Sequence, residues 1–332
     1  MGKLTRRTIM SNAAAATAGA FAPTITSSAA EAAAPLTGTQ APGFYRYKVG
    51  DYEVTAVTDG ANTFPLPDGF VANVKKEVVS AALAAAHRHP ETVTIPYTPI
   101  VVNTGAKLVV IDTGQGEAAF DRTKGTAGQF QRNLAAAAID RNAVDLVVIS
   151  HFHGDHVNGL LTTDSKPAFP KAEILVPRVE WAYWMDDGEM SRAPAGRMQD
   201  LFKNNRRVFD ALGRKVTPYE WDKEIAPGLT AIGTVGHTPG HTSYVLASGS
   251  NRVFVQSDVT NIPVLFARNP GWHAGFDQDP RTAEATRRRV YDMIVAEKMP
   301  IQGFHYTFPG LAHLEKAGDG YREVPVPWSP VI

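Results

Sequence analysis

The segment ISHFHGDHVNGL, residues 149–160, places three histidines and an aspartate within six positions, from His151 to His156. It continues a run of aliphatic residues, 146–149, that has the composition of a buried strand. A polar loop with solvated histidines would account for one such side chain, but not for four of them at this spacing. Any fold of this chain therefore has to place a cluster of ligand-type side chains at the end of a buried strand.

The spacing within HFHGDH suits two ions rather than one. In an extended backbone, residues i and i+2 face the same side, so His151 and His153 can reach a single ion. Gly154 permits a sharp turn, after which Asp155 and His156 point towards a second ion. Neutral imidazoles and carboxylates are suitable ligands for Zn²⁺, Mn²⁺, Fe²⁺ and Co²⁺.

Three later segments supply the further ligands that a metal site needs, again after strand-like runs. The segment VGHTPGHTSY carries His237 and His241, and VFVQSDVTN reaches Asp258 at the end of an apolar run. Near the C-terminal end, IQGFHYTFPG carries His305. Histidines and carboxylates are the expected ligands here because the chain of 332 residues has no cysteine, which excludes thiolate zinc sites, cysteine nucleophiles and disulfides.

The order of elements indicates an α/β protein with an αββα four-layer sandwich. Strand-like runs alternate with amphipathic helical segments in two blocks, and residues 104–106 form a hairpin turn between two of the strands. Helices are predicted at residues 74–88, 127–139, 178–185, 196–213 and 281–297. The formal net charge is zero, so no broad basic surface suggests a nucleic-acid partner.

The first 34 residues differ in composition from the rest of the chain. They contain Arg6-Arg7 in a basic segment, then a small and mildly apolar alanine-rich stretch, which resembles a twin-arginine export signal. The alternative is a disordered alanine-rich tail. We expect residues 1–34 to be a signal peptide for a periplasmic or secreted protein, and residues 35–332 to be the hydrolase domain. The stretch is too weakly apolar for stable insertion into a membrane.

The motifs HxHxDH and GHTPGH, an aspartate after an apolar strand and a C-terminal histidine together resemble the metallo-β-lactamase superfamily. The resemblance covers essentially the whole chain after residue 34 and implies two divalent ions, most simply zinc, with Mn, Fe or Co as alternatives. It implies one ion held by His151, His153 and His237, a second held by Asp155, His156 and His305, and Asp258 as the bridge. It also implies that Asp112 and His241 do not bind the ions themselves but position the side chains that do.

The chemistry that this resemblance implies is hydrolysis by a metal-bridging hydroxide, with Asp155 or Asp258 passing a proton to the leaving group. Segments such as VVNTGAKLVVIDTG and YTFPGLAHLEKAGDGYREVPV are similar to methyl parathion hydrolase and its secreted relatives. The expected substrate is a small ester, lactone or phosphotriester, and a homodimer is implied. Three alternatives remain: an N-acyl-homoserine lactonase, although Asn261 stands where many lactonases have tyrosine; a mononuclear-iron oxygenase; and a non-catalytic metal-binding module.

Substrate selectivity has to come from the walls of the pocket, which the sequence indicates less directly. The candidate wall residues are large or aromatic: Phe120, Trp184, Phe266, Trp272 and His273. The alternative for Trp184 is a place in the core of its helix. Apolar walls discriminate weakly, by about 1–3 kcal/mol per methylene, so these residues predict a tolerant esterase that hydrolyses charged substrates poorly.

The export signal can be tested in the intact chain. Replacing Arg6 and Arg7 by lysine should leave the precursor in the cytoplasm, because the twin-arginine route requires the arginine pair. Cell fractionation followed by immunoblotting measures the distribution. Normal export of this variant would show that the chain does not use that route.

Overall fold

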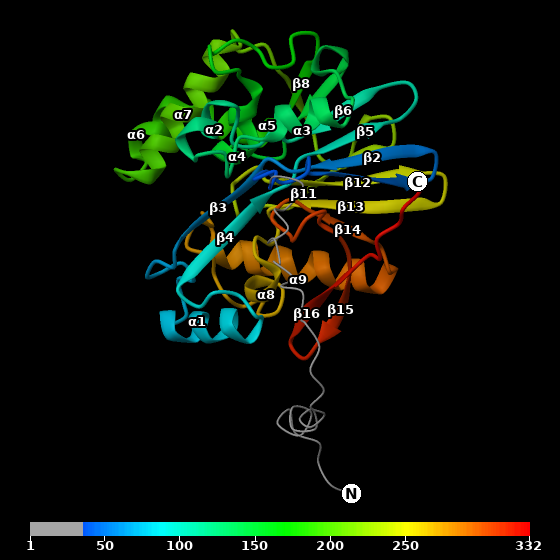
Figure 1. The fold of residues 1–332 in the computed structure, drawn as a ribbon. Helices are drawn as coiled ribbons and strands as arrows, with labels where there is room; N and C mark the ends of the chain where they lie inside the picture. Colours follow the sequence, from blue (N-terminus) through cyan, green and yellow to red (C-terminus); the bar gives the residue numbers. More distant parts are fainter. Residues whose placement is uncertain (1–35) are drawn as a thin grey trace, which may run out of the picture. The chain divides into compact units, whose positions relative to one another are not determined.

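Two sheets of seven strands face each other in the computed structural model, which describes residues 36–332 (Figure 1). The predicted signal peptide, residues 1–34, lies outside these described residues. The first sheet has the order β1 (Phe44–Val49), β2 (Tyr52–Val57), β5 (Ile100–Asn103), β6 (Leu108–Ile111), β7 (Leu146–Val148), β8 (Glu173–Pro177) and β9 (Thr217–Tyr219). The second has the order β10 (Glu224–Ala226), β11 (Leu229–Gly233), β12 (Thr242–Ser248), β13 (Asn251–Ser257), β14 (Ile301–Gly303), β15 (Leu311–Ala317) and β16 (Gly320–Pro325).

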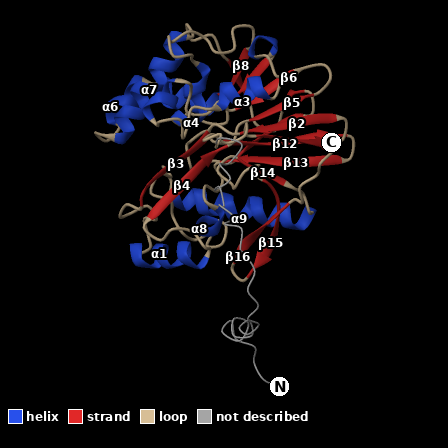
Figure 2. Ribbon diagram, viewed as in Figure 1, coloured by secondary structure: helices blue, strands red, loops and turns tan. Residues whose placement is uncertain are grey.

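Helices cover the outer face of each sheet (Figure 2). Helices α3 (Phe130–Ala136), α5 (Arg178–Met185) and α7 (Arg197–Ala211) pack on the first sheet, and α9 (Pro280–Glu297) packs on the second. The remaining α-helices in this part of the chain are α1 (Lys76–Ala85), α2 (Ala118–Arg122), α4 (Gly154–Val157), α6 (Asp187–Arg192) and α8 (Pro263–Phe266). This arrangement confirms the predicted αββα sandwich. Within residues 36–332, none of the helices is both long and apolar enough to cross a membrane.

Alternation along the strands explains why four layers form. Val147 packs against the outer helices, whereas its neighbour Val148 faces the opposite sheet. In the second sheet, Phe254 packs under α9, whereas Val255 faces inwards. Successive side chains of a strand point to opposite faces, so strands that are apolar on both sides have to be covered on both sides.

The strand directions bring the ligand segments to one region. Strands β6, β7, β8 and β9 are mutually parallel, and β13 is parallel to β14. The carboxyl ends of parallel strands lie at the same edge of a sheet. Asp112 follows β6, residues 149–156 follow β7, Asp258 follows β13 and His305 lies two residues after β14. The loop that carries His237 connects β11 to β12.

The structure confirms one local element of the sequence prediction and differs from it in two others. The predicted hairpin turn between β5 and β6 is confirmed, with the Thr104 N–H donating to the Lys107 carbonyl at 3.0 Å. The helix predicted at residues 74–88 is shorter in the structure, where α1 spans Lys76–Ala85. The separate hairpin of β3 (Gly60–Pro65) and β4 (Thr92–Tyr97) was not predicted, because the polar and glycine-containing sequence of β3 lacks a clear apolar alternation.

Candidate metal centre

The first ligand segment changes from extended to helical backbone within a few residues. His153 is extended, with φ −73° and ψ 153°, and it is the N-cap of α4. Asp155 and His156 lie in the single turn of α4 that follows. His151 and His153 share one group of ligand-type side chains, and Asp155 and His156 share another, while His151, His156 and Asp258 form a third group that connects the two.

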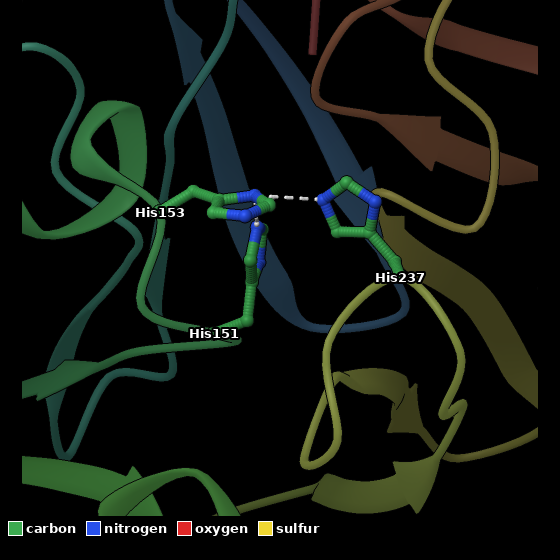
Figure 3. A group of neighbouring side chains, drawn as sticks. All are labelled: His151, His153 and His237. Carbon is green, nitrogen blue, oxygen red and sulfur yellow. Dashed lines mark hydrogen bonds between the residues drawn. The ribbon is translucent and has the colours of Figure 1, made fainter. Parts of the chain in front are cut away.

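The first group consists of His151, His153 and His237, whose potential ligand atoms lie within 4.8 Å of one another. Nδ1 of His153 lies 3.1 Å from Nε2 of His151 and 2.9 Å from Nε2 of His237 (Figure 3). All three rings are buried. Burial lowers the pKa of His151 and of His153 well below the ordinary value, so both imidazoles stay neutral and can act as ligands.

The second group consists of Asp155, His156 and His305. Oδ2 of Asp155 lies 3.7 Å from Nε2 of His156 and 3.5 Å from Nε2 of His305. Burial disfavours a charge on His156, but Asp112 and Asp258 outweigh that effect and hold its pKa well above the ordinary value. The balance is the same for His305, whose pKa is raised by Asp258. The carboxylates around these two histidines therefore favour a positive charge at this place.

The carboxylate of Asp258 reaches both groups. Its Oδ1 lies 3.3 Å from Nε2 of His156, and its Oδ2 lies 2.9 Å from Nε2 of His305 and 3.4 Å from Nε2 of His237. Within residues 36–332, the buried atoms Asp258 Oδ1 and His156 Nε2 have no hydrogen-bond partner. Buried polar atoms are rarely left unpaired, so this donor set fits two cations with Asp258 between them.

A second layer of side chains fixes how the ligand rings are oriented. Nδ1 of His156 donates to Oδ2 of Asp112, and Nδ1 of His237 donates to Oδ1 of Asp277, both at 2.8 Å. Nδ1 of His305 donates to the carbonyl of Pro96 at 2.7 Å. Such contacts hold the tautomer that presents Nε2 to an ion. Asp112 is where the sequence prediction placed it, but Asp277 was missed because it lies in an irregular segment without a motif.

His241 supports the bridge rather than joining a ligand group. Its Nε2 accepts a hydrogen bond of 3.0 Å from the backbone N–H of Asp258, and its Nδ1 lies 2.8 Å from the hydroxyl of Thr234. Burial lowers the pKa of His241 to about 3, which keeps Nε2 free to accept. His241 therefore positions the residue whose carboxylate reaches both groups.

Glu180, a fully buried residue of α5, ties the two ligand loops together. Its Oε1 accepts hydrogen bonds from the N–H of Phe152 at 3.0 Å and from Nε1 of Trp184 at 3.1 Å. Its Oε2 accepts from the N–H of Gly240 at 2.9 Å. Position 240 has to be glycine for this approach, because a Cβ there would lie 2.3 Å from the Glu180 nitrogen. Nothing in the sequence marks Glu180 as part of the site.

The cleft beside the two groups has a volume of about 190 Å³. It is bordered by His153, Asp155, His237, Asp258 and His305 from the ligand groups. The other side chains around it are Ile95, Tyr97, Gln115, Arg197, Leu201, Asn261 and Phe276. Most of these seven were not predicted, because they come from separate segments that carry no recognisable motif.

The five predicted wall residues lie elsewhere, which corrects that prediction. Trp184 is fully buried in the core, 4.7 Å from the ring of Phe202, so the alternative of a helix-core position holds. Phe266 is also fully buried. The remaining three have other neighbours: Phe120 packs on Arg132, Trp272 borders a groove beside α1 and α8, and His273 pairs with Glu284. Size and aromaticity selected these residues, and both properties are equally typical of a core.

The number of ions tests the ligand assignment. Elemental analysis of metal-replete protein should give about two equivalents per chain, because the donors form two groups with one shared carboxylate. His305→Ala should lower this towards one equivalent, since it removes a ligand of the second group alone. The exposed His313→Ala is the matched control and should keep both ions. One equivalent in the parent protein, unchanged by His305→Ala, would contradict the assignment.

The tie made by Glu180 predicts a loss of both stability and metal affinity. Glu180→Ala leaves the buried N–H groups of Phe152 and Gly240 unpaired, at a cost of about 1–3 kcal/mol each. It should also weaken metal binding about 10–100-fold, as for other residues that position ligands. Glu180→Gln keeps one accepting oxygen, so its stability and its metal affinity should lie between those of the parent and of Glu180→Ala.

Thermal denaturation with and without chelator, together with metal titration, measures both effects of the Glu180 variants. Glu220→Ala is the control, because Glu220 forms an exposed ion pair with Arg178 that is worth at most about 1 kcal/mol. Unchanged metal affinity in Glu180→Ala would show that the two ligand loops keep their geometry without this tie.

Comparisons with known proteins agree with this geometry. The chain is 24% identical over 224 residues to an N-acyl homoserine lactonase from Bacillus sp., which covers 63% of this chain and 80% of that protein. Its fold matches AidC, a dizinc quorum-quenching lactonase, with a TM-score of 0.79, 22% identity, and coverage of 86% of this chain and 98% of AidC. It matches the hydrolase AbOPH with a TM-score of 0.79, 25% identity, and coverage of 88% and 100%.

A family model described as the metallo-beta-lactamase superfamily matches residues 96–293. This range contains six of the seven ligand-type side chains, and His305 lies beyond it. The motifs, the two facing sheets and the convergent histidines and aspartates all lead to the same conclusion: the chain belongs to the metallo-beta-lactamase superfamily.

Proposed function

We propose that this chain is a hydrolase of small esters, lactones or phosphotriesters that works with two divalent ions, most simply zinc. The observation that carries the proposal is Asp258, whose two oxygens reach both groups of ligand-type side chains. Two ions bound here would make hydroxide available near neutral pH and would polarise the oxygen of the substrate under attack. A purely structural ion would have its donors closed around it, whereas these donors border a cleft.

Among residues 36–332, the side chains that border the cleft include no serine, threonine or cysteine. The chain has no cysteine, and the nearby Ser150 and Ser257 are buried behind the ligands, with both hydroxyls in contact with Asp112. Proton transfer to a leaving group falls to Asp155, because its carboxyl group is 20% exposed and borders the cleft, whereas that of Asp258 is only 4% exposed. Asp258 is better placed to hold the two groups together.

Lactones are the first substrates to test. The similarity to N-acyl homoserine lactonases from Bacillus and to AidC supports a lactone, and the resemblance to methyl parathion hydrolase supports a phosphotriester. In this chain Asn261 borders the cleft at the position where many lactonases carry tyrosine, so a carboxamide replaces a phenol there. A mononuclear-iron oxygenase would need one group of ligands, and more than one group converges here.

Export of the chain and its assembly as a homodimer are further proposals. They rest on the composition of residues 1–34 and on the family resemblance. The proposed partner of the site is a small neutral or charged ester.

The proposed activity predicts that the kcat of hydrolysis depends strongly on Asp258. Purified zinc-loaded protein should hydrolyse at least one of three substrates: an N-acyl homoserine lactone, an aryl ester or an aryl phosphotriester. Asp258→Asn should lower kcat at least about 100-fold, because even residues behind the ligands are worth 10–100-fold in such sites. The exposed Asp200→Asn is the control and should retain the parent kcat. Oxygen consumption without hydrolysis would favour the oxygenase alternative.

A further inference from the structure

Among the described residues 36–332, Arg197 is the one arginine or lysine that borders the cleft. It is the first residue of α7, directly after Gly196, whose φ of 86° turns the chain into the helix. Leu201 lies four residues later and borders the cleft as well. Residues four apart share one face of a helix, so the first turn of α7 presents a guanidinium and an apolar side chain to the cleft.

The guanidinium of Arg197 is not engaged by the protein. Within residues 36–332 it has no hydrogen bond and no ion pair, whereas Arg206 on the same helix pairs with Asp187 at 2.6 Å. The acidic groups whose charges act on Arg197 are Asp155 and Asp277. Asp155 belongs to the second ligand group, and Asp277 accepts from His237. The five N–H donors of Arg197 are therefore available to a ligand.

The charge around the cleft also favours an anionic ligand near Arg197. Two divalent ions would bring four positive charges, which the four carboxylates of Asp155, Asp258, Asp112 and Asp277 would balance, so Arg197 would supply the positive excess beside the cleft. Clefts of one charge sign concentrate ligands of the opposite sign. The neutral polar groups of Gln115 and Asn261 also border the cleft. The cleft is therefore less apolar than the sequence predicted, and its walls favour a charged substrate where the sequence prediction disfavoured one.

We propose that Arg197 is a specificity-determining residue that binds a carboxylate on the substrate, so that the preferred substrates are anionic esters or lactones. The proposal rests on the proposed hydrolase function and names its substrate class. The guanidinium would form charge-assisted hydrogen bonds with the carboxylate, while the ester group would lie beside the two groups of ligand-type side chains. Leu201, Ile95 and Phe276 would contact the apolar part of the same molecule.

A matched pair of substrates tests this assignment. Phenyl acetate and 4-carboxyphenyl acetate differ in one carboxylate, and the ratio of their kcat/KM values, anionic over neutral, is measured for each variant. Arg197→Leu should lower this ratio about tenfold relative to the parent, mainly through the KM of the anionic ester, since a charge-assisted contact at a partly exposed site is of that size. Arg197→Lys should retain part of the preference, because it keeps the charge but loses the planar fork.

Lys203→Leu is the control for charge. It removes a positive charge from α7 at an exposed side chain that does not border the cleft, so the ratio should stay at the parent value. Equal ratios in the parent, Arg197→Leu and Lys203→Leu would overturn the proposal. An equal fall in Arg197→Leu and Lys203→Leu would also overturn it, because the effect would then be the general charge of the helix.

A binding measurement separates failure of this proposal from failure of the proposed function. Calorimetry gives the Kd of 4-hydroxybenzoate and of neutral 4-hydroxybenzamide for metal-loaded protein, with metal content checked in every variant. Arg197→Leu should weaken binding of the carboxylate about tenfold and leave binding of the amide less affected. If neither ester is hydrolysed, the proposed function is decided by the lactone and the phosphotriester named above, and this binding comparison still decides the role of Arg197. Equal binding of the carboxylate by parent and variant would refute it.

Discussion

The buried carboxylate of Asp258 is the interaction on which the site depends. Burying an ionised carboxylate is costly unless opposite charge lies beside it, and the groups beside Asp258 are imidazoles that also belong to the two ligand groups. Burial would raise the pKa of Asp258, but His305 and His156 hold it well below its ordinary value. Positive charge at this place, from a proton or from a metal ion, is therefore a condition for this packing.

The scaffold holds this charge in place by stiff local geometry at the strand ends. Asp112 directly follows β6, and Ser257 is the last residue of β13. Both have a left-handed backbone, with φ of 58° and 51°. Such conformations are strained for residues other than glycine and persist only where the surroundings impose them. Here the surroundings are the hydrogen bonds of Asp112 with Ser150 and His156. Of the nine such non-glycine residues in the described part of the chain, these two lie where the sheets pass into the ligand loops.

The sequence was sufficient for the fold and for the grouping of the ligands, because both follow from local pattern. Two blocks of strands with covering helices predicted the sandwich, and the spacing of HFHGDH assigns His151 and His153 to one group and Asp155 and His156 to another. The structure contains both groups, and it also brings His151 and His156 together with Asp258 in a third. The wall of the cleft could not be predicted in this way. Trp184 shows the reason: a large aromatic residue near a site has the same local pattern in a core as in a pocket, and only tertiary packing distinguishes them.

Helix α7 shows how core, ligand loops and selectivity are connected. Its Phe202 packs on Trp184, Trp184 donates to Glu180, and Glu180 holds both ligand loops. One turn earlier, the same helix presents Arg197 to the cleft. A change on the core face of α7 is therefore expected to act on metal geometry through Glu180, whereas a change in its first turn alters the wall of the cleft directly. Arg197 also lies close enough to His153 and Asp155 for its charge to act on them, so substrate preference and the electrostatics of the metal centre are coupled through this turn.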